Sequence, residues 1–333
     1  MFGGLSFLVV GLMLLFLSAV LFFVADKTEL IDTEKLGNLP PLIDWSFLLL
    51  IIAIFCLLSE YMSFATVFLI MSILCGIAWI LHYSYRKKHQ EILEPLSIWH
   101  FIDYLRGFFF IFAVIFLLRS FLVDLSIIPS SSMRPGLVVG DFVLVDKFHY
   151  GIKLPITNRM LLARHPVARG DIIVFNYPLN RKIQYVKRVV GLPGDTVELK
   201  DKNLYINGEL IAKSALEATS YLENSYNVQV PYSVAVYRYR QSLGNTTFNI
   251  YEIPNRPTLD KTNVKPSNTC QVKSNDYISC HLPPGKFFVL GDNRDNSEDG
   301  RYWGFVDEKD IQGRPFFVWM NFKDFSRIGK RVK

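Results

Sequence analysis

Two short stretches of this chain carry residues that could perform nucleophilic chemistry. Residues 127–136 read IIPSSSMRPG and place three consecutive serines, 130–132, shortly after a long apolar run. A serine hydroxyl is a poor nucleophile until a positioned base removes its proton. The second stretch, IQYVKRVVG at 183–191, places Lys187 and Arg188 between apolar residues. The question is therefore which residue could serve as the base for a serine.

Histidine and metal ions are poorly supported as the activating group. After residue 124 the chain holds His149, His165 and His281, and none has neighbours in the sequence that indicate a positioned base. Metal-binding spacings such as H-E-x-x-H are absent from the sequence. A pair of carboxylates stays open, because residues 291–299, GDNRDNSED, are rich in acids.

Lysine is the remaining base. Side chains alternate between the two faces of a strand, so one of Lys187 and Arg188 is expected on the buried face, with Tyr185 or with Val186. Taken alone, a lysine on a strand is most often exposed. Burial would lower the pKa of the lysine by desolvation, and a general base at neutral pH needs such a lowered pKa.

The first part of the chain has the composition of a membrane anchor. Residues 5–24 are apolar or small and long enough to cross ~30 Å of hydrocarbon. They lack a basic start and a small-x-small cleavage site, so a retained anchor is expected rather than a cleaved signal. Residues 47–84 form either one long crossing or a hairpin of two. Residues 107–123 form the last crossing, with Arg119 where its side chain can reach the interface. Three or four crossings are expected.

Charge predicts the orientation of the chain. The loop at 85–106 holds four Lys and Arg residues, whereas the loop at 26–46 holds two among five acids. The positive-inside rule then places 85–106 in the cytoplasm and everything after residue 124 on the opposite side. We therefore expect a membrane anchor at 1–124 and an extracytoplasmic catalytic domain at 125–333. The net charge of +6 comes without a basic block, so nucleic acid is not an expected partner.

After Pro135 the sequence pattern alternates in the manner of β-strands. Six segments rich in Val, Ile, Phe and Tyr are predicted strands: 141–148, 170–177, 183–191, 196–211, 285–293 and 313–322. The Asn207-Gly208 pair predicts a hairpin turn. A mainly β domain of antiparallel sheets is expected, with a polar insert at about 212–280 that contains a strand near 234–240 and nothing that looks catalytic.

The four cysteines fall into two pairs. Cys56 and Cys75 lie in apolar runs and are interpreted as small buried hydrophobic residues. Cys270 and Cys280 lie in a polar stretch and are expected to form a disulfide in an oxidising compartment. A metal site with two cysteines stays open, although only His281 is a neighbouring ligand.

Several of these segments occur together in a familiar order. They are IIPSSSMRP, GDFVLVDKFHYGIKLPI, RGDIIVF, YVKRVVGLPGD, YINGE and GDNRDNSEDGRYWGFV. The set closely resembles the bacterial type I signal peptidases, membrane-anchored Ser-Lys proteases that remove signal peptides from exported proteins. The resemblance covers about residues 119–211 and 283–320. It implies a mainly β fold of two antiparallel sheets and a dyad that needs no metal, cofactor or histidine.

The resemblance also implies a role for individual residues. Ser132 matches the family's nucleophile and Lys187 its general base. Ser130 matches the serine whose hydroxyl joins the Ser132 backbone N–H in binding the oxyanion. Ser297 matches the serine that orients the lysine.

Further residues are implied to support the site or to bind substrate. Asp299 and Arg301 match an ion pair that supports the dyad. Ile128 and Val186 are expected to help form the shallow pocket that admits alanine and excludes larger side chains, and Tyr185 is also expected to bind substrate. The substrate implied is an extended preprotein segment bound along strand edges, with small side chains at the first and third positions before the cut.

The resemblance places the protein in the bacterial cytoplasmic (inner) membrane, with its catalytic domain on the outer, periplasmic side. The lipid bilayer and the nearby secretion translocon are the expected partners besides preproteins. Phe316, Phe317, Trp319 and Met320 either dip into the lipid surface or belong to an ordinary core strand. The chain departs from the family pattern at Ser131, where glycine is common, and in the insert. These departures are expected to change loop geometry and substrate approach, not the dyad.

Two other classes of protein share part of the pattern. A self-cleaving repressor of the Ser-Lys type would need a DNA-binding domain in place of the membrane helices, and the sequence shows none. A catalytically inactive membrane receptor with a β ectodomain would keep the fold. The intact set of Ser132, Lys187 and Ser297 argues against that alternative.

Overall fold

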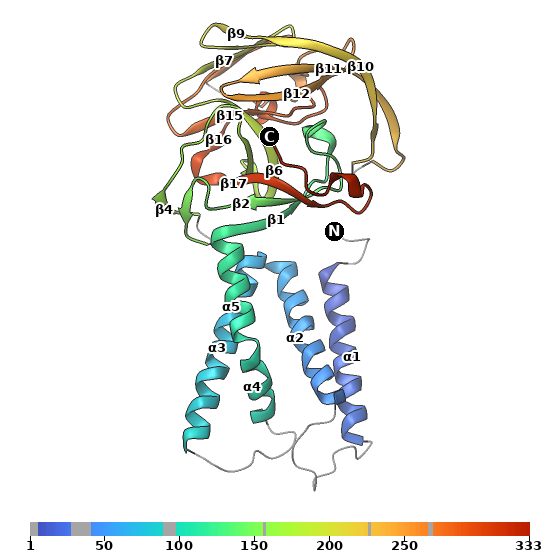
Figure 1. Cartoon of the computed structure of the whole chain (residues 1–333), viewed down its shortest axis with the longest axis vertical. Helices are drawn as coiled ribbons and strands as arrows, with labels where there is room; N and C mark the ends of the chain where they lie inside the picture. The colour runs from blue at the N-terminus through green and yellow to red at the C-terminus, as the bar shows by residue number, and fades with distance from the viewer. Residues whose placement is uncertain (1–5, 28–40, 89–97, 156–157, 226–227, 266–268) are drawn as a thin grey trace. The chain divides into compact units, whose positions relative to one another are not determined.

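The computed structural model describes residues 6–27, 41–88, 98–155, 158–225, 228–265 and 269–333. The chain divides into two compact units, Met1–Ser120 and Phe121–Lys333. The first is helical and the second is built mainly of β-strands (Figure 1). The predicted fold class, apolar N-terminal helices followed by a mainly antiparallel β domain, is confirmed.

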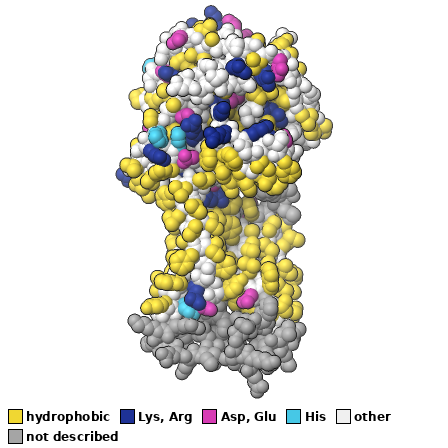
Figure 2. Space-filling view, in the orientation of Figure 1, with side chains coloured by type: hydrophobic (Ala, Val, Ile, Leu, Met, Phe, Trp, Pro, Cys, Tyr) yellow, Lys and Arg dark blue, Asp and Glu magenta, His cyan; other side chains and the backbone are white. Residues whose placement is uncertain are grey.

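The helical unit contains four segments with the length and hydropathy of membrane spans, among the residues described. They are Phe7–Ala25, Leu42–Tyr61, Phe64–Ser84 and Phe101–Leu122. The helices that carry them are α1 (Phe7–Lys27), α2 (Pro41–Tyr61), α3 (Phe64–Lys88), α4 (Ile98–Gly107) and α5 (Phe109–Leu117), the last continued by a π-helical turn at Leu118–Leu122. Hydrophobic side chains cover the visible faces of these helices (Figure 2), as expected for helices that are solvated by lipid.

The apolar block at 47–84 is a pair of helices rather than one long crossing. The break falls at Met62 and Ser63, where the Ser63 hydroxyl accepts a hydrogen bond from the Thr66 backbone N–H at 3.3 Å and so caps the start of α3. Hydropathy alone could not show this break, because a serine inside an apolar run is compatible with a continuous helix.

The prediction of a loop throughout 85–106 is wrong at both ends. Helix α3 continues to Lys88, α4 begins at Ile98, and the last span begins at Phe101. The Asp103 carboxylate accepts a hydrogen bond from Arg106 Nε at 2.5 Å, one turn along α4. Such i,i+3 pairs let charged residues stay within a helix, so their presence did not mark a loop.

The largest sheet of the β unit has seven strands in the order β1-β2-β17-β5-β6-β15-β16 (Figure 1). All neighbouring strands in it pair antiparallel. Its strands are β1 (Val123–Ile127), β2 (Phe142–Asp146), β5 (Ile172–Tyr177), β6 (Asn180–Gly191), β15 (Lys286–Leu290), β16 (Val306–Asp307) and β17 (Ile311–Met320).

Three smaller sheets complete the β unit, so the described residues form four sheets rather than the two that the family resemblance implied. A five-stranded sheet contains β13 (Cys270–Ser274), β14 (Tyr277–His281), β7 (Thr196–Lys200), β8 (Asn203–Ile206) and β9 (Glu209–Ile211). A three-stranded sheet contains β10 (Lys213–Glu223), β11 (Tyr232–Leu243) and β12 (Thr246–Glu252). The last pair is β3 (Gly151–Lys153) and β4 (Met160–Ala163). The extra sheet β10-β11-β12 comes from the insert, which the resemblance did not cover.

Each of the six predicted strand segments contains a strand, and the strand expected at 234–240 lies within β11. The segment 196–211 is divided into three strands by two turns. One of them is the predicted Asn207-Gly208 turn, in which both residues have positive φ, 53° and 83°. Strand β1 was missed: the last crossing was predicted to end at residue 123, the first residue of β1, and no strand was predicted between it and Pro135.

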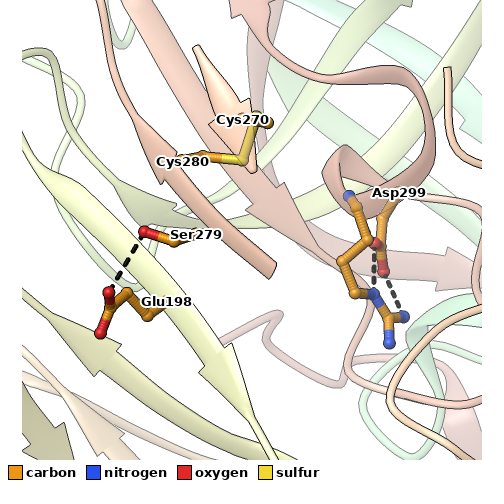
Figure 3. Close-up of a disulfide and its surroundings, with 6 residues drawn as sticks. Glu198, Cys270, Ser279, Cys280 and Asp299 are labelled. Atoms are coloured by element: carbon orange, nitrogen blue, oxygen red, sulfur yellow. Dashed lines mark hydrogen bonds and ion pairs between the residues drawn. A yellow bond between two sulfur atoms is a disulfide. The ribbon is translucent and has the colours of Figure 1, made fainter. Parts of the chain in front are cut away.

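The predicted disulfide between Cys270 and Cys280 is present, and the two residues face each other across β13 and β14 (Figure 3). Nearby, Ser279 donates a hydrogen bond from its hydroxyl to Glu198 Oε1 at 3.2 Å, which links β14 to β7. Cys56 and Cys75 are buried free thiols in the helical unit, as predicted.

Candidate active site

Two segments that are far apart in the sequence meet at one pair of polar side chains. Ser132 lies in a short 3₁₀ helix at Ser131–Met133, and Lys187 lies on β6. The distance between Lys187 Nζ and Ser132 Oγ is 2.7 Å. Both residues are buried: Lys187 is 4% exposed and Ser132 is 8% exposed. At this distance a proton can pass directly between hydroxyl and amine.

The backbone around Ser132 is held from two sides. We call residues 130–133 the serine turn and residues 291–299 the acidic loop. Met133 is 1% exposed and packs in an apolar cluster with Ile128 and Val143. On the other side, the Asn293 N–H of the acidic loop donates to the Ser132 carbonyl at 3.0 Å. The serine turn is therefore fixed against both the core and the acidic loop.

The environment of Lys187 favours the neutral amine. Burial lowers the pKa of Lys187 to about 8, although the nearby carboxylates of Asp299 and Glu298 raise it. Asp292 also raises this pKa, and the Arg301 guanidinium lowers it. An amine with a pKa near 8 is neutral in an appreciable fraction of molecules at neutral pH, and only the neutral form can accept the Ser132 proton.

The prediction that only one of Lys187 and Arg188 is buried is wrong, because both are. Arg188 is 1% exposed, and its Nε and Nη2 each donate to the Asp292 carboxylate at 2.7 Å. Its guanidinium lies 3.7 Å from the centre of the Phe248 ring on β12. Alternation does place the two side chains on opposite faces, but the insert covers the second face as well.

Ser130 and Ser297 both lie close to Ser132. Ser130 Oγ is 3.3 Å from Ser132 Oγ. Ser297 Oγ is buried and has no hydrogen-bond partner among the described residues, so it does not make the contact with Lys187 that the resemblance implied. It packs against Gly291 instead. A Cβ on Gly291 would lie 2.2 Å from Ser297 Oγ and 2.6 Å from the Ser132 carbonyl oxygen, so the absence of a side chain lets these segments approach.

Asp299 and Arg301 form a buried ion pair (Figure 3 labels Asp299). Arg301 Nε and Nη2 donate to the two Asp299 oxygens at 2.8 and 2.9 Å, and Asp299 Oδ2 also accepts from the Gly291 N–H at 3.0 Å. Burial raises the pKa of Asp299, but Arg301 and the Gly291 N–H lower it by more. The pKa is therefore below its ordinary value, and the carboxylate stays ionised. The pair thus holds the start of the acidic loop.

The three residues expected to bind substrate lie beside the dyad with unequal accessibility. Ile128 is only 3% exposed, whereas Val186 is partly exposed against the same apolar cluster. Tyr185 is also partly exposed, and its ring stacks on Tyr177 at 4.4 Å. Lys187 Nζ lies 5.3 Å from the centre of the Tyr185 ring. Val186 and Tyr185 therefore offer more surface to a peptide than Ile128 does.

Residues of the insert contact the serine turn, and no pattern in the sequence predicted this contact. The Ser131 hydroxyl donates to Glu223 Oε1 at 2.9 Å, and the Ser131 N–H donates to Ser225 Oγ at 3.0 Å. These partners are 92 and 94 residues away along the chain. The only signal that could have pointed to them was Ser131 itself, a polar residue where glycine is common.

The histidines considered as alternative bases contact other residues of the β unit, whereas the carboxylates of the acidic loop lie near Lys187. The His149 and His165 rings lie near each other, 5.3 Å apart, and His281 contacts Thr196 on β7 at 3.2 Å. Within the part of the chain that the structure describes, the Ser132 hydroxyl contacts Lys187 and Ser130. Groups of three or more His, Cys, Asp or Glu arranged to hold a metal are not found among the described residues.

Apolar helices joined to a β unit with a buried serine–lysine pair define a membrane-anchored serine hydrolase. Comparison with known proteins gives the family. The family model described as "Signal peptidase, peptidase S26" matches residues 101–320. Proteins named signal peptidase I are 36% identical in Buchnera aphidicola (77% of this chain and 92% of the relative), 37% in Pseudomonas aeruginosa (71% and 80%) and 36% in Aquifex aeolicus (65% and 82%).

This chain belongs to the signal peptidase family, peptidase S26. It is therefore a serine endopeptidase that cleaves signal peptides from preproteins and is anchored in a membrane by its apolar helices.

Proposed function

We propose that Ser132 is the nucleophile of this endopeptidase and Lys187 its general base. The observation that carries the proposal is the buried contact of 2.7 Å between Ser132 Oγ and Lys187 Nζ. Burial lowers the pKa of this amine to about 8, so it can be neutral where an ordinary lysine would be charged. Nucleophile and base within hydrogen-bond distance are the arrangement that serine activation requires.

The reaction then proceeds through an acyl-enzyme. Lys187 takes the Ser132 proton as Oγ attacks the scissile carbonyl carbon, and the Ser130 hydroxyl and the Ser132 backbone N–H stabilise the oxyanion. The Lys187 ammonium returns the proton to the leaving amine when the peptide bond breaks. The neutral amine next deprotonates a water that attacks the ester, which releases the signal peptide and restores Ser132.

The acidic loop supports this chemistry through its contact with the serine turn. We assign to Asp299 and Arg301 the task of holding the loop at Gly291, since Asp299 bonds both the guanidinium and the Gly291 N–H. We assign to Ser297 the orientation of the Lys187 amine during the reaction. Its hydroxyl is buried beside Gly291 and has no other partner among the described residues, so it is available for that contact.

The preprotein is proposed to bind as an extended segment along strand edges near the dyad, with small side chains at the first and third positions before the cut. The partly exposed Val186 and Tyr185 support such a shallow pocket. The rest of the signal peptide would lie toward lipid, at the outer face of the cytoplasmic membrane and close to the secretion translocon.

An exposed apolar surface on the β unit supports contact with lipid. Its members lie on β17 or shortly after it, and Figure 2 shows hydrophobic side chains gathered on this unit. They are exposed by between 36% and 66%: Phe316, Trp319, Phe322, Phe325 and Ile328. Apolar patches of this kind on a water-exposed domain are typical of interaction surfaces. Phe317 and Met320, also on β17, are only partly exposed.

The test is preprotein processing by purified protein in detergent. Because a dyad acts as a unit, Ser132→Ala and Lys187→Ala should each abolish cleavage, and the double variant should lose little more than either. Lys182→Ala changes an exposed lysine on the same strand and serves as the control, with wild-type activity expected. Substantial turnover by Lys187→Ala would remove the lysine from its role. A wild-type protein that binds preprotein without cleaving it would support the inactive receptor.

A further inference from the structure

The insert places a buried carboxylate beside the serine turn. Glu223 is the last residue of β10 and is 3% exposed. Its Oε1 accepts hydrogen bonds from the Ser131 hydroxyl at 2.9 Å and from the Ser225 N–H at 3.0 Å. Its Oε2 accepts from Asn296 Nδ2 at 2.5 Å. One carboxylate therefore joins the serine turn to the acidic loop.

The two loops that meet at Glu223 carry the groups proposed for catalysis. Ser131 stands between Ser130 and Ser132, and Asn296 immediately precedes Ser297. Each carboxylate oxygen holds one of these loops. Loss of the bond to Ser131 would shift Ser130 and Ser132. Loss of the bond to Asn296 would shift Ser297.

A second residue of the same strand strengthens this junction. Tyr221 lies two positions before Glu223 and thus on the same face of β10. Its hydroxyl accepts hydrogen bonds from Asn293 Nδ2 at 2.8 Å and from Asn296 Nδ2 at 2.9 Å. The Arg134 guanidinium, which follows the serine turn, lies 5.0 Å from the centre of the Tyr221 ring. The end of β10 therefore contacts both loops at several points.

The partners of Glu223 fit an ionised carboxylate. Ser131, Ser225 and Asn296 all act as donors to it, and an ionised carboxylate is an acceptor only. Burial raises the pKa of Glu223, but the hydrogen bonds from Ser225, Ser131 and Asn296 lower it by more, so the pKa lies below its ordinary value. Acidic side chains are rarely buried unless they are paired, and these donors supply the pairing that keeps Glu223 between the two loops.

We propose that Glu223 is a positioning residue for signal-peptide cleavage, which acts by holding Ser131 and Asn296 at a fixed separation. It touches neither the substrate nor the reacting atoms. The inference rests on the proposed roles of Ser132 and Lys187, because it assigns to the insert the task of fixing the geometry of that pair and of Ser297.

The Glu223→Gln variant tests the proposal with little change in volume. The Ser225 N–H keeps the carbonyl oxygen of the glutamine, so the glutamine amide nitrogen faces Asn296 Nδ2. Either the two donors oppose each other, or the Asn296 amide turns over and loses the bonds that its Nδ2 donates to Glu223 and to the Tyr221 hydroxyl. We expect kcat to fall by about 10- to 100-fold, the size expected for a displacement of about 1 Å at a catalytic group, with KM within about twofold of wild type.

Exchanging the donor and acceptor roles of residues 223 and 296 should rescue the activity that Glu223→Gln loses. In the double variant Glu223→Gln with Asn296→Asp, the glutamine donates to the new carboxylate, and the Tyr221 hydroxyl can donate to it as well. The double variant should therefore recover much of the kcat that Glu223→Gln loses. Asn296→Asp alone should be impaired, because it sets two carboxylates against each other. A double variant no better than Glu223→Gln would contradict the pairing.

Glu252→Gln is the matched control. Glu252 is a 4% exposed carboxylate on β12 of the same sheet, and it pairs with Lys213 Nζ at 2.5 Å, away from the serine turn. It should lower the thermal midpoint while kcat stays at the wild-type value. If kcat of Glu223→Gln falls no further than kcat of Glu252→Gln at equal thermal midpoint, Glu223 is only structural and the proposal is overturned.

The remaining outcomes separate this inference from the proposed dyad. Active Ser132→Ala protein would refute the dyad itself, whatever Glu223 does. Inactive Ser132→Ala with fully active Glu223→Gln would refute only the positioning role. If Glu223→Gln does not fold, Ser131→Ala removes one bond to the carboxylate and should still lower kcat several-fold; a wild-type kcat for Ser131→Ala would then overturn the proposal.

Discussion

The behaviour of Lys187 is set by opposing effects on one amine. Burial lowers its pKa from 10.5 to about 8, a shift that corresponds to a cost of about 3 kcal/mol to the folded state. Because the folded pKa lies below the unfolded value, this cost is fully present below about pH 8 and disappears as pH rises to about 10.5. The carboxylates of Asp299 and Glu298 keep the shift from being larger.

The first prediction concerns the pH dependence of cleavage. A base must be neutral, so kcat/KM should fall as pH drops through the pKa of Lys187, with a midpoint near 8 on the acid side. Glu298→Gln removes a negative charge that raises this pKa, so the midpoint should move to lower pH by a few tenths of a unit.

The matched control for the pH experiment is Glu209→Gln, which neutralises another exposed carboxylate, on β9, that does not contribute to the Lys187 pKa. Its pH–rate profile should coincide with that of wild type. A Glu298→Gln profile that moves to higher pH, or an acid limb centred near the ordinary pKa of histidine, would contradict a lysine base.

A second prediction concerns Gly291, whose Cα lies between two parts of the site. In Gly291→Ala the new Cβ would lie within 2.6 Å of both Ser297 Oγ and the Ser132 carbonyl, so one segment must move. We expect a loss of about 1–3 kcal/mol in stability and a large fall in kcat. Gly136→Ala is the control, because its nearest contacts would be ordinary ones at 3.7 and 3.8 Å. Equal activity of the two variants would show that the approach at Gly291 does not matter.

For single residues, the sequence predicted which residues belong to the site better than it predicted their contacts. The resemblance pointed to Ser132 and Lys187, and the structure brings these two side chains together. It could not predict that Ser297 packs against Gly291 or that Ser131 bonds Glu223. Such contacts depend on the exact placement of loops joined by long-range strand pairing, which no local pattern encodes.

Helices were predictable from long apolar runs, and strands from short runs of alternating or continuous apolar residues. The alternating segment around Val143 became strand β2, and the continuous apolar run at 172–175 became the fully buried part of β5, both in the central sheet. Strand β1 has only five residues and directly follows an apolar helix, so its pairing with β2 is what identifies it as a strand. The insert formed a sheet of its own because strands β10 and β11 pair over their whole lengths, a long-range effect with a weak local signal.

The third prediction concerns the disulfide between Cys270 and Cys280 on β13 and β14. It closes a short loop, ten residues in sequence separation, and should contribute about 2 to 3 kcal/mol to stability. Mild reduction should therefore lower the thermal midpoint of the β unit. Cleavage should persist, because the dyad is held by β6 and the serine turn rather than by these strands.

The control for the reduction experiment is the double variant Cys270→Ala with Cys280→Ala, whose stability should no longer respond to reductant. Cys56 and Cys75 are buried free thiols, so they supply no disulfide to reduce. Loss of cleavage on reduction of wild type, but not on adding reductant to the double variant, would mean that this edge of the five-stranded sheet shapes the site.

For the whole molecule, the number of spans determines which ends share a side of the membrane. If all four apolar segments cross the membrane, the N-terminus and the β unit lie on the same side, and the connections that follow α1 and α3 lie together on the other. The acids near the first connection do not oppose this arrangement, because the positive-inside rule counts Lys and Arg and gives acids little weight. The short break between α2 and α3 at Met62 and Ser63 holds no Lys or Arg, which fits the outer side that this arrangement would give it.

The fourth prediction follows from this count of spans. A reporter enzyme that is active only outside the cytoplasm should be active when fused after Lys333, and also at the N-terminus, and silent when inserted near residue 95. A reporter that is active only in the cytoplasm should give the opposite pattern, which guards against a fusion that is merely unfolded. Opposite sides for the N-terminus and Lys333 would mean that one of the four apolar helices does not cross. Activity of the first reporter near residue 95 would reverse the orientation. The dyad would then lie in the cytoplasm, where preproteins have not yet been inserted into the membrane.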